Sequence, residues 1–167
     1  MAARLKSNGR KPAGRGHANE LAAADFRRLA EFRYRIRQFL HLTEEAARAH
    51  GIEPQQHQLL LAIKGLPEAA RPTVSTLSER LCLRHHSTVE LVDRLEKQGA
   101  IARRHGDEDR REVLLALTPA GEKLLAQITA SIWPELRTAS KSLSESLSAL
   151  SFPALKERRR HAAHASR

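Results

Sequence analysis

Residues 103–121 have the sequence RRHGDEDRREVLLALTPAG, which combines four arginines with four acidic residues before it becomes apolar. The consecutive acids Asp107, Glu108 and Asp109 could hold Mg²⁺ for phosphoryl transfer, a chemistry that also requires a loop to bind nucleotide phosphates. The sequence contains no glycine-rich phosphate-binding loop, and the nearby arginines partly neutralise the carboxylates. We therefore predict no enzyme activity. The stretch is either a solvated turn or a surface that contacts a charged partner.

The nine histidines and the single cysteine raise the possibility of a zinc site. Their spacing contains no CxxC, HExxH or comparable ligand pattern, so we expect neither a metal nor a cofactor. Cys82 alone cannot form an internal disulfide, and the sequence has no apolar run of about 18 residues that could cross a membrane. These features predict a reduced, cytoplasmic protein without a membrane partner.

The formal net charge of +10 is concentrated at the two ends of the chain. Residues 1–19 carry five Lys or Arg and no acid, and residues 156–167 carry five Lys or Arg and one acid. The residues between these tails are close to neutral, with 19 basic and 18 acidic side chains. Basic tails attract polyanions such as DNA or RNA, although solubility alone explains them equally well.

Apolar residues at steps of three and four predict a mainly helical chain. Thr73 and Thr118 are each placed to cap a helix that follows, and Pro134 is expected to kink or interrupt the last helical region. The expected helices cover about residues 21–50, 54–64, 74–81, 86–98 and 119 onwards, with a further helix after Pro153.

Two β-prone runs, at 100–104 and 112–118, flank the charged stretch and predict a hairpin. Two short helices joined by a tight turn and followed by an arginine-bearing hairpin are the parts of a winged helix-turn-helix. In that fold the second helix enters the major groove of DNA. Its predicted inner face consists of Thr88, Val89, Val92 and Leu95, with Leu91 beside them. The opposite face carries His86, Ser87, Glu90, Arg94 and Lys97.

Two stretches, VSTLSERLCLRHHSTVELVDRLEKQGAIARR and DRREVLLALTPAG, resemble the MarR-type bacterial transcription regulators. The family pattern is an Asp, any residue, an Arg, and then a strand that ends in Leu-Thr, with a Gly three positions later. The matching residues are Asp109, Arg111, Leu117, Thr118 and Gly121. The resemblance covers about residues 25–150. It implies a mainly α fold, a winged helix-turn-helix with a two-stranded β wing, and long N- and C-terminal helices that form a dimerisation region.

This resemblance and the tail composition predict five segments along the chain. They are a disordered basic arm at 1–19, an N-terminal dimerisation helix at 20–53, a winged helix-turn-helix DNA-binding domain at 54–118, C-terminal dimerisation helices at 119–155, and a basic tail at 156–167.

By resemblance, Arg111 at the wing tip enters a minor groove of DNA, while Asp109 orients basic neighbours such as Arg94. A guanidinium suits this position because A·T-rich minor grooves concentrate negative potential. Glu90 is repelled by phosphates unless it accepts a hydrogen bond from a cytosine N4 amino group or pairs with Arg94. The predicted DNA-contacting residues are Arg84, His85, His86, Ser87, Glu90, Arg94, Arg103, Arg104, Asp109, Arg110 and Arg111.

Cys82 stands where helix-turn-helix sequences often have glycine, so we expect no strict left-handed turn there and a buried thiol that packs the turn. The resemblance also implies a small aromatic or anionic effector that binds between the dimer helices and the winged helix. The residues that could line such a pocket are Arg33, Tyr34, Arg37, His41 and His57. Helix packing and solvation explain these residues equally well.

These observations predict a homodimer that binds a pseudo-palindromic operator in double-stranded DNA and regulates transcription, as a repressor or an activator, of which a repressor is favoured. One alternative is an architectural protein that coats DNA through its basic tails without reading sequence. Another is a winged helix used for protein contacts, which the near-neutral central part of the chain would permit.

Overall fold

The computed structural model describes residues 23–106 and 111–150 of the chain. Its order of helices and strands confirms the order predicted from the sequence. The predicted arm at 1–19, the predicted tail at 156–167 and the helix expected after Pro153 lie outside the described residues. The elements are α1 (Ala23–Ala49), α2 (Pro54–Lys64), α3 (Val74–Leu81), α4 (His85–Lys97), β1 (Ile101–His105), β2 (Val113–Leu117) and α5 (Pro119–Leu150).

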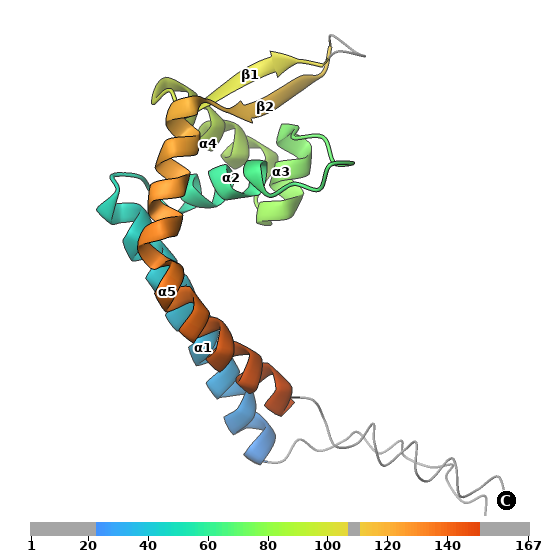
Figure 1. Cartoon of the computed structure of the whole chain (residues 1–167). Helices are drawn as coiled ribbons and strands as arrows, with labels where there is room; N and C mark the ends of the chain where they lie inside the picture. Colours follow the sequence, from blue (N-terminus) through green and yellow to red (C-terminus); the bar gives the residue numbers. More distant parts are fainter. Residues whose placement is uncertain (1–22, 107–110, 151–167) are drawn as a thin grey trace, which may run out of the picture.

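The described chain forms a head and a stalk (Figure 1). The head, residues 54–117, contains α2, α3, α4 and the antiparallel pair of strands β1 and β2. The stalk consists of α1 and α5, which pack against each other and extend away from the head. The N-terminal part of α5 also packs on α2 and β2, so this helix connects the two parts of the molecule.

The core of the head is aliphatic. Leu59 and Leu60 from α2, Leu77 from α3, Val92 from α4 and Leu115 from β2 are buried together. The inner face of α4 differs in one respect from the prediction, because Leu91 is buried whereas Val89 is only half-buried. The buried face, which packs against α2, α3 and β1, is therefore rotated toward Leu91 and away from Val89.

The start of α5 is fixed against the end of α4 by the Leu-Thr-x-x-Gly part of the motif. The Thr118 hydroxyl accepts a hydrogen bond from the Gly121 amide at 3.1 Å and lies 2.5 Å from the Gly99 carbonyl oxygen, to which it donates. Gly121 lies so close to Ala100 that an added Cβ atom would fall 1.9 Å from the Ala100 carbonyl oxygen. Only glycine allows this approach, so the motif sets how α5 leaves the head.

The helix α5 runs through Pro134 without interruption and bends along its length (Figure 1). Pro134 therefore does not interrupt the helix, which packs along α1. No helix among the described residues is long and apolar enough to cross a membrane.

Candidate nucleic-acid interface

The turn between α3 and α4 differs from the sequence prediction at Cys82. Cys82 adopts a left-handed conformation, with φ 53° and ψ 39°, and it is exposed. In this conformation the amides of Cys82 and Leu83 donate to the carbonyl oxygens of Glu79 and Ser78 at 3.1 and 2.9 Å, which caps the end of α3. Leu81 and Leu83 pack against the core in place of the thiol. The prediction of a buried thiol without a left-handed turn was therefore wrong.

The outward face of α4 is formed by the residues that helical geometry placed there. His86, Glu90, Arg94 and Lys97 are exposed, and Ser87 is half-buried. Arg84 precedes the helix and does not cap it with its side chain, and His85 begins it, exposed like Arg84. The first-turn amides of α4 are thus not covered by a capping side chain, and they can meet a phosphate as the ends of other helices do.

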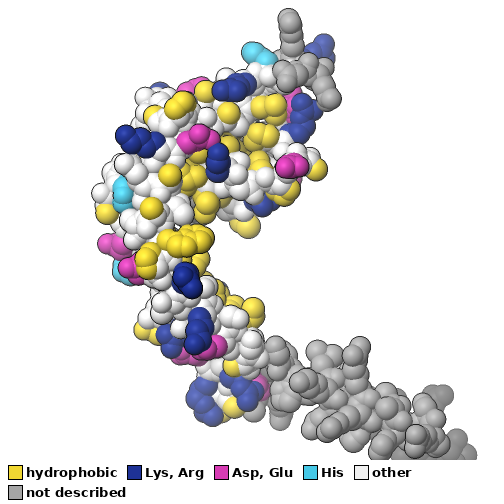
Figure 2. Space-filling view, viewed as in Figure 1, with side chains coloured by type: hydrophobic (Ala, Val, Ile, Leu, Met, Phe, Trp, Pro, Cys, Tyr) yellow, Lys and Arg dark blue, Asp and Glu magenta, His cyan; other side chains and the backbone are white. Residues whose placement is uncertain are grey.

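The outward face of α4 carries one acidic side chain, Glu90, and two basic ones, Arg94 and Lys97. Glu90 and Arg94 lie one helical turn apart, with 3.7 Å between Oε2 and an Nη atom, and both side chains are more than half exposed. Figure 2 shows basic side chains interspersed with acidic ones over the head, without one continuous basic patch on this side of the molecule.

The structure gives Arg103 a role that the sequence did not predict. Its guanidinium donates to Asp93 at 2.5 Å and also to Glu96, both on α4. The hydrogen bond with Asp93 is the main reason that the pKa of Arg103 is raised above its ordinary value. Arg103 is thus directed toward α4. We name this set, Arg103 with Asp93 and Glu96, the wing clamp.

The second strand of the wing and the residue before it are also held, by the loop that precedes α3. The amide of Leu115 in β2 donates to the Pro72 carbonyl at 2.9 Å, and Arg71 pairs with Glu112 at 2.6 Å. These contacts join the loop before α3 to the second strand of the wing. Together with the wing clamp, they fix the direction in which the hairpin extends from the head (Figure 1).

The wing itself carries the other predicted contact residues. Strands β1 and β2 pair in antiparallel register, with His105 opposite Val113 and Arg104 opposite Leu114. Arg104 and Arg111 are exposed, and Arg111 lies at the tip end of the hairpin beside the start of β2. Asp109 and Arg110 lie outside the described residues. The structure therefore brings two of the predicted wing arginines to the surface on the hairpin that adjoins α4.

The predicted effector residues lie on two elements, α1 and α2, and differ in burial. Arg33, Tyr34, Arg37 and His41 are exposed along α1, whereas His57 is buried in α2. Burial lowers the pKa of His57, and the nearby His50 acts in the same direction.

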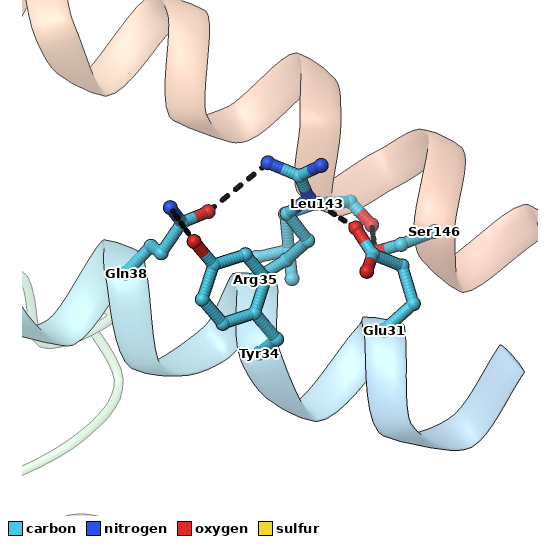
Figure 3. Close-up of polar contacts among 6 residues, drawn as sticks. All are labelled: Glu31, Tyr34, Arg35, Gln38, Leu143 and Ser146. Carbon is cyan, nitrogen blue, oxygen red and sulfur yellow. Dashed lines mark hydrogen bonds and ion pairs between the residues drawn. The ribbon is translucent and has the colours of Figure 1, made fainter. Parts of the chain in front are cut away.

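Tyr34 belongs to a network on the surface of the stalk (Figure 3). Gln38 donates to the Tyr34 hydroxyl at 2.8 Å, and Arg35 donates to Gln38 at 3.0 Å and to Glu31 at 2.7 Å. These bonds run along α1 itself, and Leu143 and Ser146 of α5 lie beside them. The Tyr34 hydroxyl is therefore hydrogen-bonded within the surface of the stalk.

An apolar groove of about 690 Å³ lies elsewhere, between α2 and α5. Leu61, Leu125 and Trp133 line it, and an ion pair between Lys64 and Glu122, 2.6 Å long, lies at its edge. Sequence reasoning missed this groove because it forms only when α5 docks on α2. Among residues 23–106 and 111–150, no group of His, Cys, Asp and Glu side chains could hold a metal ion.

The central part of the chain is similar to known sequences. A model of the MarR family matches residues 50–112. The chain is 30% identical over 86 residues to the HTH-type transcriptional repressor MdtR of Bacillus subtilis (strain 168), a match that covers 52% of this chain and 54% of that protein. It is 41% identical over 51 residues to the uncharacterized HTH-type transcriptional regulator YfiV of the same organism, which covers 30% of this chain and 32% of that protein. These matches thus span a third to about half of the relatives' length.

Solved structures share the arrangement of head and stalk over most of the chain. One is a MarR family transcription regulator, with a TM-score of 0.61 and 23% identity, covering 84% of this chain and 91% of that chain. Another is a mutant of MarR from E. coli complexed with operator DNA, with a TM-score of 0.59 and 23% identity, covering 78% of this chain and 91% of that chain. The predicted fold, mainly α with a winged helix-turn-helix and a two-stranded wing, is confirmed.

Proposed function

We propose that the chain is a member of the MarR family, whose model matches residues 50–112, and that it regulates transcription by binding a specific sequence of double-stranded DNA. The named relatives are regulators of transcription and not enzymes. In the proposed complex, α4 lies in a major groove and the wing reaches toward the adjacent minor groove. Residues 54–118 form the DNA-binding domain of this proposal.

The observation that carries the proposal is the arrangement of α4 and the wing. The outward residues of α4 have no packing role, because its opposite face fills the core of the head. The wing is fixed to that same helix through Arg103, so two DNA-contacting elements keep one relative orientation. A preformed pair of this kind lowers the entropy cost of binding a duplex.

Selection of bound duplexes from a random pool tests the proposal. We expect a pseudo-palindromic sequence to emerge, and Arg111→Ala is expected to weaken binding to it by about 1–3 kcal/mol at fixed salt concentration, with unchanged helix content. Lys123→Ala is the matched control, since Lys123 is an exposed basic side chain on α5 rather than on the wing. Equal affinities of the two variants would remove the wing from the mechanism.

The second part of the proposal is that the protein acts as a homodimer through the stalk, with residues 20–53 and 119–155 as the dimerisation segments. Phe26, Leu29 and Leu147 on the stalk are 58%, 49% and 54% exposed, and a second copy of the stalk could cover this apolar surface. Light scattering should give twice the 18.7 kDa mass of one chain. Leu29→Glu should lower the measured mass to that of one chain, whereas Val113→Glu on the wing should leave the mass unchanged.

The finer part of the proposal is a repressor that a small aromatic or anionic effector releases from DNA. The groove between α2 and α5 is a better candidate for this effector than the residues along α1, because it joins the head to the stalk. The chain has one tryptophan, Trp133, and it lines the groove. Benzoate and related aromatic acids should quench its fluorescence and lower DNA affinity. Ala130→Leu, which narrows the groove, should abolish both effects, and their persistence would place the effector elsewhere.

An architectural, sequence-independent role is the alternative, and the concentration of charge in residues 1–19 and 156–167 favours it. Removing both tails separates the two functions. If the shortened chain still prefers the selected duplex over random DNA, coating by the tails is not the function. If affinity and preference vanish together, the regulator proposal fails.

A further inference from the structure

The three acids of α4 have different surroundings in the structure. Asp93 and Glu96 both accept hydrogen bonds from Arg103, so their charges are paired with a guanidinium of β1. Glu90 lies on the outward face, with its side chain 65% exposed, and Arg94 is 3.7 Å from it. That separation is an ion-pair distance and longer than a hydrogen bond, so the Glu90 carboxylate keeps its capacity to accept hydrogen bonds from another group.

A carboxylate on this face is costly unless it has a partner on the DNA. The phosphates on both sides of the groove repel it, and most base atoms in the major groove are acceptors that repel it as well. Guanine presents N7 and O6, and thymine presents O4 and a methyl group. Two bases present an amino donor there, cytosine through N4 and adenine through N6. The adenine amino group lies beside the acceptor N7, and acidic side chains select the cytosine amino group. Glu90 therefore disfavours guanine and thymine and rewards cytosine.

Arg94 supplies the complementary half of the same pattern. A guanidinium donates two hydrogen bonds to guanine O6 and N7, the most common specific contact in protein–DNA complexes. A C·G base pair presents the cytosine amino donor beside these guanine acceptors, so it matches a carboxylate and a guanidinium that are held close together. The 3.7 Å separation of Glu90 and Arg94 provides such a pair on one helix face.

We propose that Glu90 and Arg94 together read a C·G pair at one position of each operator half-site, with Glu90 as the residue that selects cytosine. This inference rests on the proposed function, since it requires α4 to enter a major groove. In this role Glu90 lowers the affinity for random DNA and raises the discrimination between the operator and random DNA.

Selection from a random pool with the full chain and with Glu90→Gln tests the assignment. Glutamine recognises adenine through N6 and N7, so the preferred base at one half-site position should change from cytosine to adenine, with roughly tenfold discrimination in each case. Glu90→Ala should lose the preference at that position and keep the rest of the sequence. Both variants should bind random duplexes several-fold more tightly than the original chain, because one like charge is removed from the phosphate-facing side.

Glu45→Gln is the matched control, since Glu45 is an exposed acid on α1 that pairs with Arg48 by the same type of surface contact. It should change neither the selected sequence nor the affinity for random DNA. If the original chain selects a sequence and Glu90→Gln and Glu90→Ala return the same one, the assignment of Glu90 is overturned while the proposed function stands. If the original chain selects no sequence at all, the proposed function and the assignment fail together.

Discussion

Replacement of Arg103 by alanine separates a residue that positions the wing from one that contacts DNA. The guanidinium bonds with Asp93 and Glu96, and the three side chains are 33%, 46% and 38% exposed. At such exposure each ion pair contributes about 0.2–1 kcal/mol to stability, because water screens the charges. In Arg103→Ala the two carboxylates, one helical turn apart, also repel each other by a few tenths of a kcal/mol.

The expected total loss for Arg103→Ala is about 1–2 kcal/mol in the free energy of unfolding. Urea denaturation followed by circular dichroism measures it directly, and added salt should reduce the difference from the original chain. Arg104→Ala is the control, because Arg104 is the next residue of β1 and points to the other side of the strand. The free energy of unfolding of Arg104→Ala should differ from that of the original chain by less than about 0.5 kcal/mol.

DNA binding completes the comparison of these two arginines. We expect both variants to weaken binding to the selected duplex, Arg104→Ala by loss of a contact and Arg103→Ala through a wing that is no longer held. A double-mutant cycle of Arg103→Ala with Asp93→Asn should give a coupling energy of about 0.5–1 kcal/mol in stability. Equal stabilities of Arg103→Ala and Arg104→Ala, together with zero coupling, would refute the wing clamp.

Three further changes test the fold that positions the interface. Gly121→Ala should destabilise the protein by roughly 3 kcal/mol, because its Cβ atom would overlap the Ala100 carbonyl, and a normal melting curve would disprove the close approach. Cys82→Gly should stabilise it by about 0.5–1 kcal/mol by removing left-handed strain, whereas Cys82→Ala should not. Burial lowers the pKa of His57 below its ordinary value of 6.5, so the unfolded chain binds the proton more readily and stability should fall as pH decreases below 6.5. His57→Gln should reduce that slope in urea denaturation at a series of pH values, and an unchanged slope would assign the dependence to other groups.

Local chemistry was sufficient to predict the helices, the hairpin and the outward face of α4. Thr118 followed by Pro119 signals a capped helix start, and the alternation of Val113, Leu115 and Leu117 signals a strand, since both patterns depend on near neighbours in sequence. The exposed residues of α4 followed from helical periodicity for the same reason.

Features that depend on tertiary packing were not predictable in this way. Arg103 meets Asp93 only because β1 returns along α4, and no local pattern indicates that register. The conformation of Cys82 follows from how α3 must end for α4 to dock, which overrides the preference of the residue. The groove beside Trp133 likewise exists only because α5 lies on α2.

The ratio of Kd for a scrambled duplex to Kd for the selected duplex, at one fixed salt concentration, tests the central claim most directly. If the winged helix-turn-helix reads DNA sequence, the full chain should give a ratio of about 10³ or more. A ratio near one, with tight binding to both duplexes, would contradict sequence-specific regulation and leave nonspecific attraction to phosphate as the mode of binding.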